Sequence, residues 1–268
     1  MEKIHVLGTG NAMVTQCFNT CYLLEMEGDN LLVDCGGGNG ILRQLKAAGF
    51  DPAGIHHIFL THEHCDHLTG IVWMVRAAAT AMNKGRYEGV LNIYCHAGLE
   101  PMVRAICGFM LQKKMTAHFD GRILFHVVQD GQRREIGGHE FCFFDIRSTK
   151  APQFGFAARL NSGLLAFMGD EPVNPACEEY ARGAQWLLSE AFCLKGEADR
   201  FKPYEKHHST AEDAALLARR LEVKNLVLWH TEESDLAHRK ERYTAEAARC
   251  FGGGIYVPDD LDVIELGR

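Results

Sequence analysis

The chain has 268 residues, of which 47% are hydrophobic and 24% charged, and its formal net charge is -7. These values exclude a disordered tail protein, a collagen-like chain and a small disulfide-stapled scaffold. The acidic excess argues against a protein that binds nucleic acid over its whole surface, although one basic patch stays compatible with it. We expect a single domain over residues 1–268, because no repeat, low-complexity stretch or proline-rich linker divides the chain.

The cysteine pattern and the apolar runs indicate the compartment. None of the ten cysteines forms a Cys-x-x-Cys pair, and the first residues lack a basic segment followed by an apolar core. No apolar run approaches the roughly 18 residues that a membrane-spanning helix needs. We therefore expect free thiols, a cytoplasmic protein and no membrane partner.

The coarse pattern alternates short strands with helices. Nine strands are predicted, over Ile4–Leu7, Tyr22–Glu25, Asn30–Asp34, His57–Leu60, Leu91–Tyr94, Phe141–Ile146, Leu164–Met168, Trp186–Leu188 and Asn225–Trp229. Four helices are predicted, over Ile41–Ala48, Glu100–Met110, Ala176–Gly183 and Ala211–Leu221. The last of these has the clearest start signal, because Ser209 and Glu212 have the spacing of a capping box.

Polar side chains recur where the predicted strands end. Asp34, His62, Asp170, Glu190 and His230 each end or closely follow an apolar run. Layered α/β proteins build their sites at the carboxyl ends of strands. Five such residues therefore predict a shared rim of functional groups.

The strongest motif is the segment 61–67, which reads Thr-His-Glu-His-Cys-Asp-His directly after a predicted strand. Imidazole and carboxylate ligands suit zinc, manganese or iron. Alternating positions let His62 and His64 face one ion while Asp66 and His67 face another. The alternative is a polar loop of hydrogen-bonded histidines, which is disfavoured because three imidazoles so close together would repel one another on protonation.

With this motif, the sequence as a whole resembles the metallo-β-lactamase fold superfamily, and within it the ribonuclease Z branch of phosphodiesterases. The matching motifs keep the family's order over nearly the whole chain: Val6–Gly10, Leu32–Gly36, Ile58–Gly70, Leu91–Tyr94, Phe167–Asp170, His208–Ala211 and Leu228–His230. The resemblance implies an α/β (α+β) fold, a four-layer αβ/βα sandwich in which two facing mixed β-sheets are flanked by helices.

The resemblance also implies a dinuclear site for a divalent metal, with zinc expected and manganese or iron as alternatives. In that site Asp170 bridges the two ions. The remaining ligands are His62 and His64 at the first position, and Asp66, His67 and His230 at the second.

One ligand expected from the family is missing. The third histidine of the first position should fall near residue 147, where this chain has Arg147. A guanidinium is a fixed cation and cannot bind a metal. We therefore expect one well-filled metal site and one weakened or empty site. In the alternative, Arg147 occupies the vacancy and its guanidinium pairs with Asp170 or with a substrate phosphate. His126 and His139 were considered as substitutes and are expected to be surface or packing residues.

Further roles follow from the family positions. Glu190 and His208 correspond to a Glu–His pair, in which the carboxylate holds the imidazole in one tautomer so that it assists the leaving oxygen. Asp66 would also orient or deprotonate the attacking water. Asp34 is expected to hydrogen-bond a ligand imidazole, and Cys65 to be a small buried filler.

These features predict a metal-dependent hydrolase, a ribonuclease Z-like phosphodiesterase that uses a metal-activated water on a small or single-stranded phosphodiester. The alternatives are a hydrolase of lactone, acyl or sulfate esters, and a non-catalytic member whose dinuclear site is disabled by Arg147. Folded transfer RNA is disfavoured, because only 23 positions separate Arg147 from Asp170 and leave no room for the arm that grips it in long-armed relatives. The resemblance makes a homodimer possible.

Overall fold

The computed structural model describes residues 2–267 and contains two seven-stranded sheets. The first sheet has the order β14-β1-β2-β3-β4-β5-β6, formed by Val263–Glu265, Lys3–Gly8, Cys21–Met26, Asp29–Val33, His57–Phe59, Leu91–His96 and Ile123–Val128. The second has the order β13-β12-β11-β10-β9-β8-β7, formed by Gly254–Tyr256, Asn225–Trp229, Trp186–Glu190, Gly163–Phe167, Phe154–Leu160, His139–Asp145 and Gln132–Ile136.

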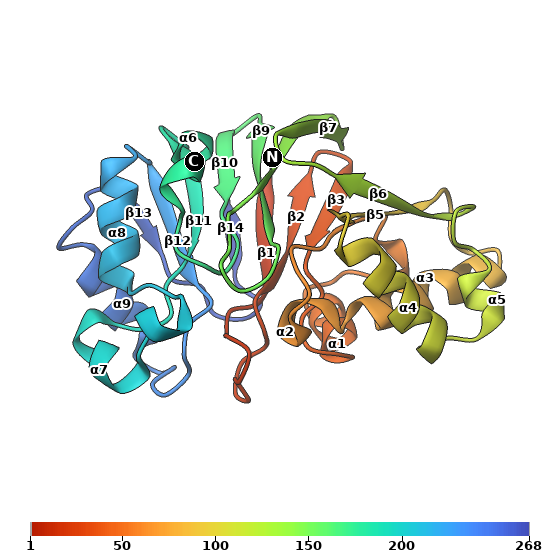
Figure 1. Cartoon of the computed structure of the whole chain (residues 1–268), viewed down its shortest axis with the longest axis horizontal. Coiled ribbons are helices and arrows are strands. Elements are labelled where there is room, and N and C mark those ends of the chain that lie inside the picture. The colour runs from red at the N-terminus through yellow and green to blue at the C-terminus, as the bar shows by residue number, and fades with distance from the viewer. Residues whose placement is uncertain (1, 268) are drawn as a thin grey trace.

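Helices cover the outer face of each sheet, which gives four layers (Figure 1). On the first sheet these are α1 (Gly40–Ala47), α3 (Ile71–Asn83), α4 (Leu99–Met110) and α5 (Lys113–Thr116), whereas the short α2 (Cys65–Leu68) lies beyond the strand ends in the loop after β4. On the second they are α6 (Glu178–Ala181), α8 (Ala211–Arg220) and α9 (Arg239–Ala247), whereas the short α7 (Ala198–Phe201) lies beyond the strand ends. Short 3₁₀ turns occupy Pro52–Gly54, Pro175–Cys177, Lys195–Glu197 and Tyr204–Lys206. The predicted four-layer sandwich is confirmed.

Three apolar cores hold the layers together. The core between the sheets is rich in aromatic side chains, including Tyr22, Phe143, Phe156 and Trp229. The other two cores lie between each sheet and its own helices. Each sheet is therefore buried on both faces, which explains why its central strands read as nearly continuous apolar runs.

Strand direction places the ends of the central strands on one rim. In the first sheet β3, β4 and β5 are parallel, and in the second β10, β11 and β12 are parallel. Their carboxyl ends carry the polar residues that the sequence singles out. Two sets of parallel strand ends thus bring together residues far apart in the chain.

The nine predicted strands and the helices α1, α4 and α8 are present, with bounds that differ by a few residues. The longest helix, α3, was missed. Eight of its 13 residues are buried, so its apolar positions run almost continuously and hide the helical period. The region predicted as a helix over Ala176–Gly183 is only a 3₁₀ turn followed by one short helix.

The capping box of α8 was predicted one residue too early. Thr210 is the N-cap residue and Asp213 its partner, with reciprocal hydrogen bonds between them. Ser209, the expected cap, instead donates its backbone N–H to Glu190 Oε1 at 2.7 Å. Within residues 2–267, no helix combines the length and the apolar character that crossing a bilayer requires.

Candidate metal centre

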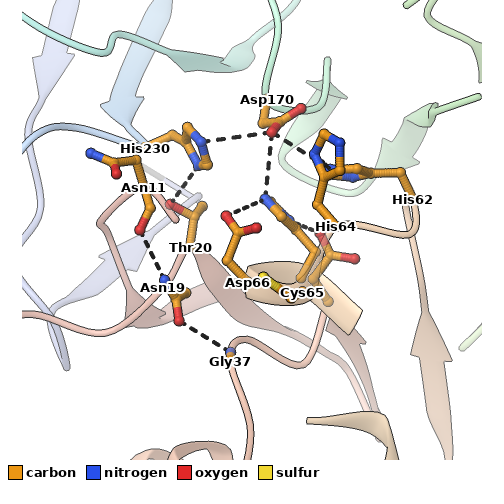
Figure 2. Close-up of polar contacts among 12 residues, drawn as sticks. Asn11, Asn19, Thr20, Gly37, His62, His64, Cys65, Asp66, Asp170 and His230 are labelled. Atoms are coloured by element: carbon orange, nitrogen blue, oxygen red, sulfur yellow. Dashed lines mark hydrogen bonds and ion pairs between the residues drawn. The ribbon is translucent and has the colours of Figure 1, made fainter. Parts of the chain in front are cut away.

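Three buried imidazoles converge on one carboxylate oxygen (Figure 2). The Nε2 atoms of His62, His67 and His230 lie 3.6, 3.5 and 3.6 Å from Asp170 Oδ2. Each of these side chains is at least nine-tenths buried. Two ligand atoms that each bind a tetrahedral zinc ion at about 2.0–2.2 Å lie roughly 3.4 Å apart. The spacing of these four atoms therefore matches a metal coordination shell.

The hydrogen bonds behind two of the imidazoles fix a proton on Nδ1, so that Nε2 is the atom that faces the centre. His67 Nδ1 lies 2.7 Å from Asp34 Oδ2, which can only accept. His230 Nδ1 lies 3.2 Å from the Thr20 hydroxyl, whose proton is donated to a backbone carbonyl. Both rings thus carry their proton on Nδ1, the tautomer that a metal ligand needs.

The Nδ1 atom of His62 is also held by a hydrogen bond, in this case to the hydroxyl of the preceding residue, Thr61. The Thr61 hydroxyl donates to Asp34 Oδ2 at 2.8 Å, so it accepts a hydrogen bond from His62 Nδ1 at 2.9 Å. Asp34 therefore supports His67 directly and His62 through Thr61. His64 completes this side of the site, with its Nδ1 2.8 Å from His62 Nε2.

The electrostatics of these residues favour a cation. Burial lowers the pKa of His62 well below its ordinary value and that of His230 to about 3, so both rings are neutral. Burial alone would raise the pKa of Asp170, but His67 outweighs it and holds the pKa of Asp170 low. The pKa of His67 is itself raised well above its ordinary value, against the effect of burial, by the carboxylates of Asp34 and Asp66. His67 Nε2 is buried without a hydrogen-bond partner. Imidazole nitrogens beside ionised carboxylates are the ligand chemistry of zinc and similar ions, and a bound ion would displace the proton from His67 Nε2.

Among the described residues, two groups bring ligand atoms within 4.8 Å of one another. One contains His62, His67 and Asp170, and the other contains Asp66, His67 and His230. Asp66 Oδ2 lies 3.3 Å from His67 Nε2. His64 lies at the edge of these groups and is partly exposed. The residues present thus fit at least one divalent ion.

Close backbone contact fixes the loop that carries these ligands. A Cβ atom on Gly70 would lie 2.0 Å from the Cys35 carbonyl oxygen, so only glycine fits there. This approach lets the Cys35 N–H donate to His67 O at 2.8 Å. The turn after β3 and the ligand loop after β4 are therefore packed directly on each other.

The backbone is strained at two of the site residues. Asp34 and His230, each next to the end of a strand, have positive φ angles of 58° and 56°. Non-glycine residues in this region cost about 1–3 kcal/mol each and cluster at functional sites. In both cases the conformation turns the side chain toward the same centre.

The expected pairing of Arg147 with Asp170 is not borne out. The Arg147 guanidinium instead forms ion pairs with Asp130 at 2.5 Å and Asp145 at 3.2 Å, and it is half exposed. The residue that contacts the carboxylate is Gln153, whose Nε2 donates to Asp170 Oδ1 at 2.6 Å. Arg147 therefore does not obstruct the centre.

The substitutes considered for the missing ligand lie elsewhere. His126 Nε2 is 2.8 Å from Asn92 Oδ1, and His139 Nδ1 is 3.3 Å from the Arg159 carbonyl oxygen. Neither belongs to the groups of potential metal ligands in the described part of the chain. The expected burial of Cys65 is wrong, because its side chain is exposed.

The structure brings Glu190 and His208 together beside the centre. Glu190 Oε2 and His208 Nδ1 are 3.5 Å apart, and both atoms are buried without a closer hydrogen-bond partner. The His208 ring stacks on Phe192 and lies 5.4 Å from the ring of His230. The pair therefore adjoins the candidate metal ligands without belonging to them.

A cavity of about 650 Å³ opens onto these residues. Its walls include His64, Asp66, Asp170, His208 and His230. The walls also contain side chains that the sequence motifs did not assign to the site: the loop residues Asn11–Val14, the aromatic rings of Phe192 and Phe201, and Lys150. Gln153, Thr20 and these wall residues carry no motif, and only the tertiary structure reveals their place.

Comparisons with known proteins agree with this geometry. The family model described as "Anti-Pycsar protein Apyc1" matches residues 2–241. Ribonuclease Z of Methanothermobacter thermautotrophicus is 28% identical over 317 aligned residues, covering 99% of this chain and 97% of the relative. Ribonuclease Z of Mycobacterium marinum is 26% identical, with 99% of both chains covered.

Solved structures show the same fold. The metallo-β-lactamase fold protein YhfI of Bacillus subtilis matches with a TM-score of 0.79 at 20% identity, over 98% of both chains. The short form of human tRNase Z matches with a TM-score of 0.73 at 21% identity, over 98% of this chain and 99% of the other. The predicted resemblance is confirmed: the chain is a ribonuclease Z-like protein of the metallo-β-lactamase fold, with the residue set of a metal-dependent hydrolase, and it belongs to the Anti-Pycsar protein Apyc1 family.

Proposed function

We propose that the protein is a metal-dependent phosphodiesterase that acts on small or single-stranded phosphodiesters. The observation that carries this proposal is the convergence of three imidazole Nε2 atoms on Asp170 Oδ2 at the wall of a cavity that also contains His208. A bound divalent ion, with zinc as our first choice, would lower the pKa of a water molecule and neutralise charge on the phosphate.

The chain's own groups divide the remaining work. Asp66 faces the cavity and accepts the proton of the attacking water or orients that water. His208 delivers a proton to the departing oxygen, and Glu190, 3.5 Å from its Nδ1, keeps the ring in the orientation for that transfer. Because His208 lies on a different element from Asp66, the acid and the base can approach opposite sides of the phosphorus atom.

We further propose that the two metal positions differ in strength. His62 and His64 lack the third histidine that the family supplies at the first position, whereas Asp66, His67 and His230 form a complete set with Asp170. Fewer ligands give weaker binding at the first position. Metal analysis after dialysis tests this proposal: we expect one retained ion per chain and a second that is lost.

The cavity walls support a small substrate. Lys150 and Lys206 line the cavity and can attract phosphate oxygens, while Phe192 and Phe201 offer aromatic faces for a base or another flat group. A volume of about 650 Å³ suits a small molecule. Folded transfer RNA, to which the name of human tRNase Z refers, would need a larger cationic surface.

A substrate panel tests the activity. Metal-loaded protein is assayed on a chromogenic phosphodiester, a dinucleotide, precursor transfer RNA, a lactone and an aryl sulfate. We expect turnover of the first two that is abolished by chelation and restored by zinc or manganese. Preferential turnover of the lactone or sulfate would favour another ester class, and no turnover of any substrate by loaded protein would favour a non-catalytic role.

We also propose a cytoplasmic location and a homodimeric state. All ten cysteines are free, which supports a reducing compartment and therefore the cytoplasm. The homodimer rests on the resemblance alone. Sedimentation of the purified protein over a range of concentrations tests it.

A further inference from the structure

Gln153 is a buried polar side chain to which neither the family motifs nor the proposed mechanism gives a role. Its side chain is 1% exposed and lies in the segment between β8 and β9. Backbone hydrogen bonds fix this segment on both sides: Ile146 N donates to Gln153 O, and Phe154 N donates to Thr61 O. These backbone hydrogen bonds hold the carboxamide of Gln153 next to Asp170 and His62, on the side away from the cavity-facing atoms.

The carboxamide engages the one oxygen of Asp170 that does not face the imidazoles. Gln153 Nε2 donates to Asp170 Oδ1 at 2.6 Å, whereas the three Nε2 atoms face Oδ2. A carboxylate free to rotate could present either oxygen, or both together. With Oδ1 occupied, Asp170 presents a single oxygen in a fixed direction.

The same nitrogen lies beside a second ligand. Gln153 Nε2 is 3.1 Å from His62 Nδ1, the atom that also lies 2.9 Å from the Thr61 hydroxyl. Because the His62 Nδ1 proton is already donated to Thr61, Gln153 Nε2 only packs against that ring, and its hydrogen bond goes to Asp170. Groups in this position usually change metal affinity or activity by about 10–100-fold when they are removed.

We infer that Gln153 is a positioning residue of the metal centre, which holds Asp170 through Oδ1 so that Oδ2 alone binds metal. This inference rests on the proposed metal-dependent function. Gln153 makes the contact with Asp170 that was expected of Arg147, whose guanidinium forms ion pairs with Asp130 and Asp145 instead. Gln153 makes no contact with the substrate in this scheme and acts only through Asp170.

The test replaces Gln153 with methionine, which has a similar length but cannot donate to Asp170. The matched control is Gln44→Met, because Gln44 is also a buried glutamine, and its amide donates to Leu7 O and Asp260 rather than to a candidate metal ligand. Zinc affinity is measured by competition with a chromophoric chelator. We expect Gln153→Met to weaken binding by about 10–100-fold and Gln44→Met to leave it unchanged within about twofold.

A spectroscopic measurement separates positioning from a loss of packing. Cobalt(II) in place of zinc gives visible absorption bands that depend on the number and geometry of its ligands. These bands should change in Gln153→Met and not in Gln44→Met, even when both variants have the same melting temperature without metal. Unchanged affinity and unchanged bands in Gln153→Met would overturn the inference.

Two further outcomes are also decisive. If Gln153→Met does not fold, Gln153→Glu keeps the length and places a carboxylate against Asp170 Oδ1; its zinc affinity should then fall, and wild-type affinity would overturn the inference. If the wild-type chain itself binds no divalent ion, the proposed function fails at its first step. That result is distinct from a wild-type centre that binds metal but does not respond to Gln153.

Discussion

At the scale of single residues, Asp66 is the clearest test of the mechanism. It supplies a metal-facing oxygen 3.3 Å from His67 Nε2 and lines the cavity. We expect Asp66→Ala to abolish phosphodiester hydrolysis and to lower zinc affinity by more than about 100-fold, since even residues behind the ligands change it by about 10–100-fold. Steady-state assays and chelator competition measure both effects, and far-UV circular dichroism checks the fold. Near-wild-type turnover would contradict the proposed mechanism.

His208 is expected to affect chemistry without affecting the metal. It contacts Glu190 and Phe192 rather than the ligand cluster's oxygens. We predict that His208→Ala lowers kcat by roughly 10²–10⁴-fold, the usual contribution of general acid catalysis, with unchanged zinc content. The exposed His238→Ala serves as control. Equal losses in kcat and in zinc content would assign His208 to metal binding instead.

At the scale of elements, the start of α8 matters because His208 lies two residues before its N-cap. Thr210 accepts from Asp213 N at 3.3 Å and donates to Asp213 Oδ2 at 2.7 Å. We expect Thr210→Ala to destabilise the protein by about 1 kcal/mol at pH 7 and Thr210→Ser to retain most of that stability. Urea unfolding monitored by circular dichroism measures the difference. No change in Thr210→Ala would mean that Tyr204 and the helix packing hold Asp213 without the cap.

The same cap should respond to pH. Burial would raise the pKa of Asp213, but hydrogen bonds from Thr210 and Tyr204 outweigh it and hold that pKa below its ordinary value. A lowered carboxyl pKa stabilises the fold above the ordinary value of about 3.9, and this contribution is lost as pH falls through the folded-state pKa. The stability difference between wild type and Asp213→Asn should therefore be constant from pH 7 to 5 and shrink below pH 4. Urea midpoints across this range test the sign.

How far the sequence predicts these elements depends on how local their signals are. The ligand loop after β4 was predictable, because three histidines and an aspartate fall within six positions of one strand. The position of Gln153 was not, because a single glutamine carries no spacing signal and its partners Asp170 and His62 lie 17 and 91 positions away. Helix α3 was missed for the opposite reason, since burial on nearly all sides removed its amphipathic period.

At the scale of the whole molecule, the fold was predictable from motif order, whereas the fate of Arg147 was not. Whether a cation at that position turns toward the centre or the surface depends on Asp130, which sits beside β7, and on Asp145 at the end of β8. Both carboxylates form ion pairs with Arg147 where its guanidinium stays in contact with water. Burying an arginine in the centre would have required desolvating its charge. The surface position is therefore the less costly one.

The overall charge leads to a prediction about salt. The net charge is -7, and two lysines line the cavity, so the protein should neutralise no more than about two substrate phosphates at a time. Each neutralised phosphate of a single strand contributes about -0.7 to the slope of log affinity against log salt. We therefore expect kcat/KM for a single-stranded oligonucleotide to fall with potassium chloride with a slope no steeper than about -1.4, the value for two neutralised phosphates.

The two lysines provide the matched variants for that measurement. Lys150→Gln and Lys206→Gln should each make the slope shallower by about 0.7 and raise KM, while Lys84→Gln, on an exposed turn far from the cavity, should change neither. Precursor transfer RNA should be cleaved no faster than the oligonucleotide. Faster cleavage of the precursor with a slope steeper than about -4 would mean that a larger cationic surface engages folded RNA, and the small-substrate proposal would then be wrong.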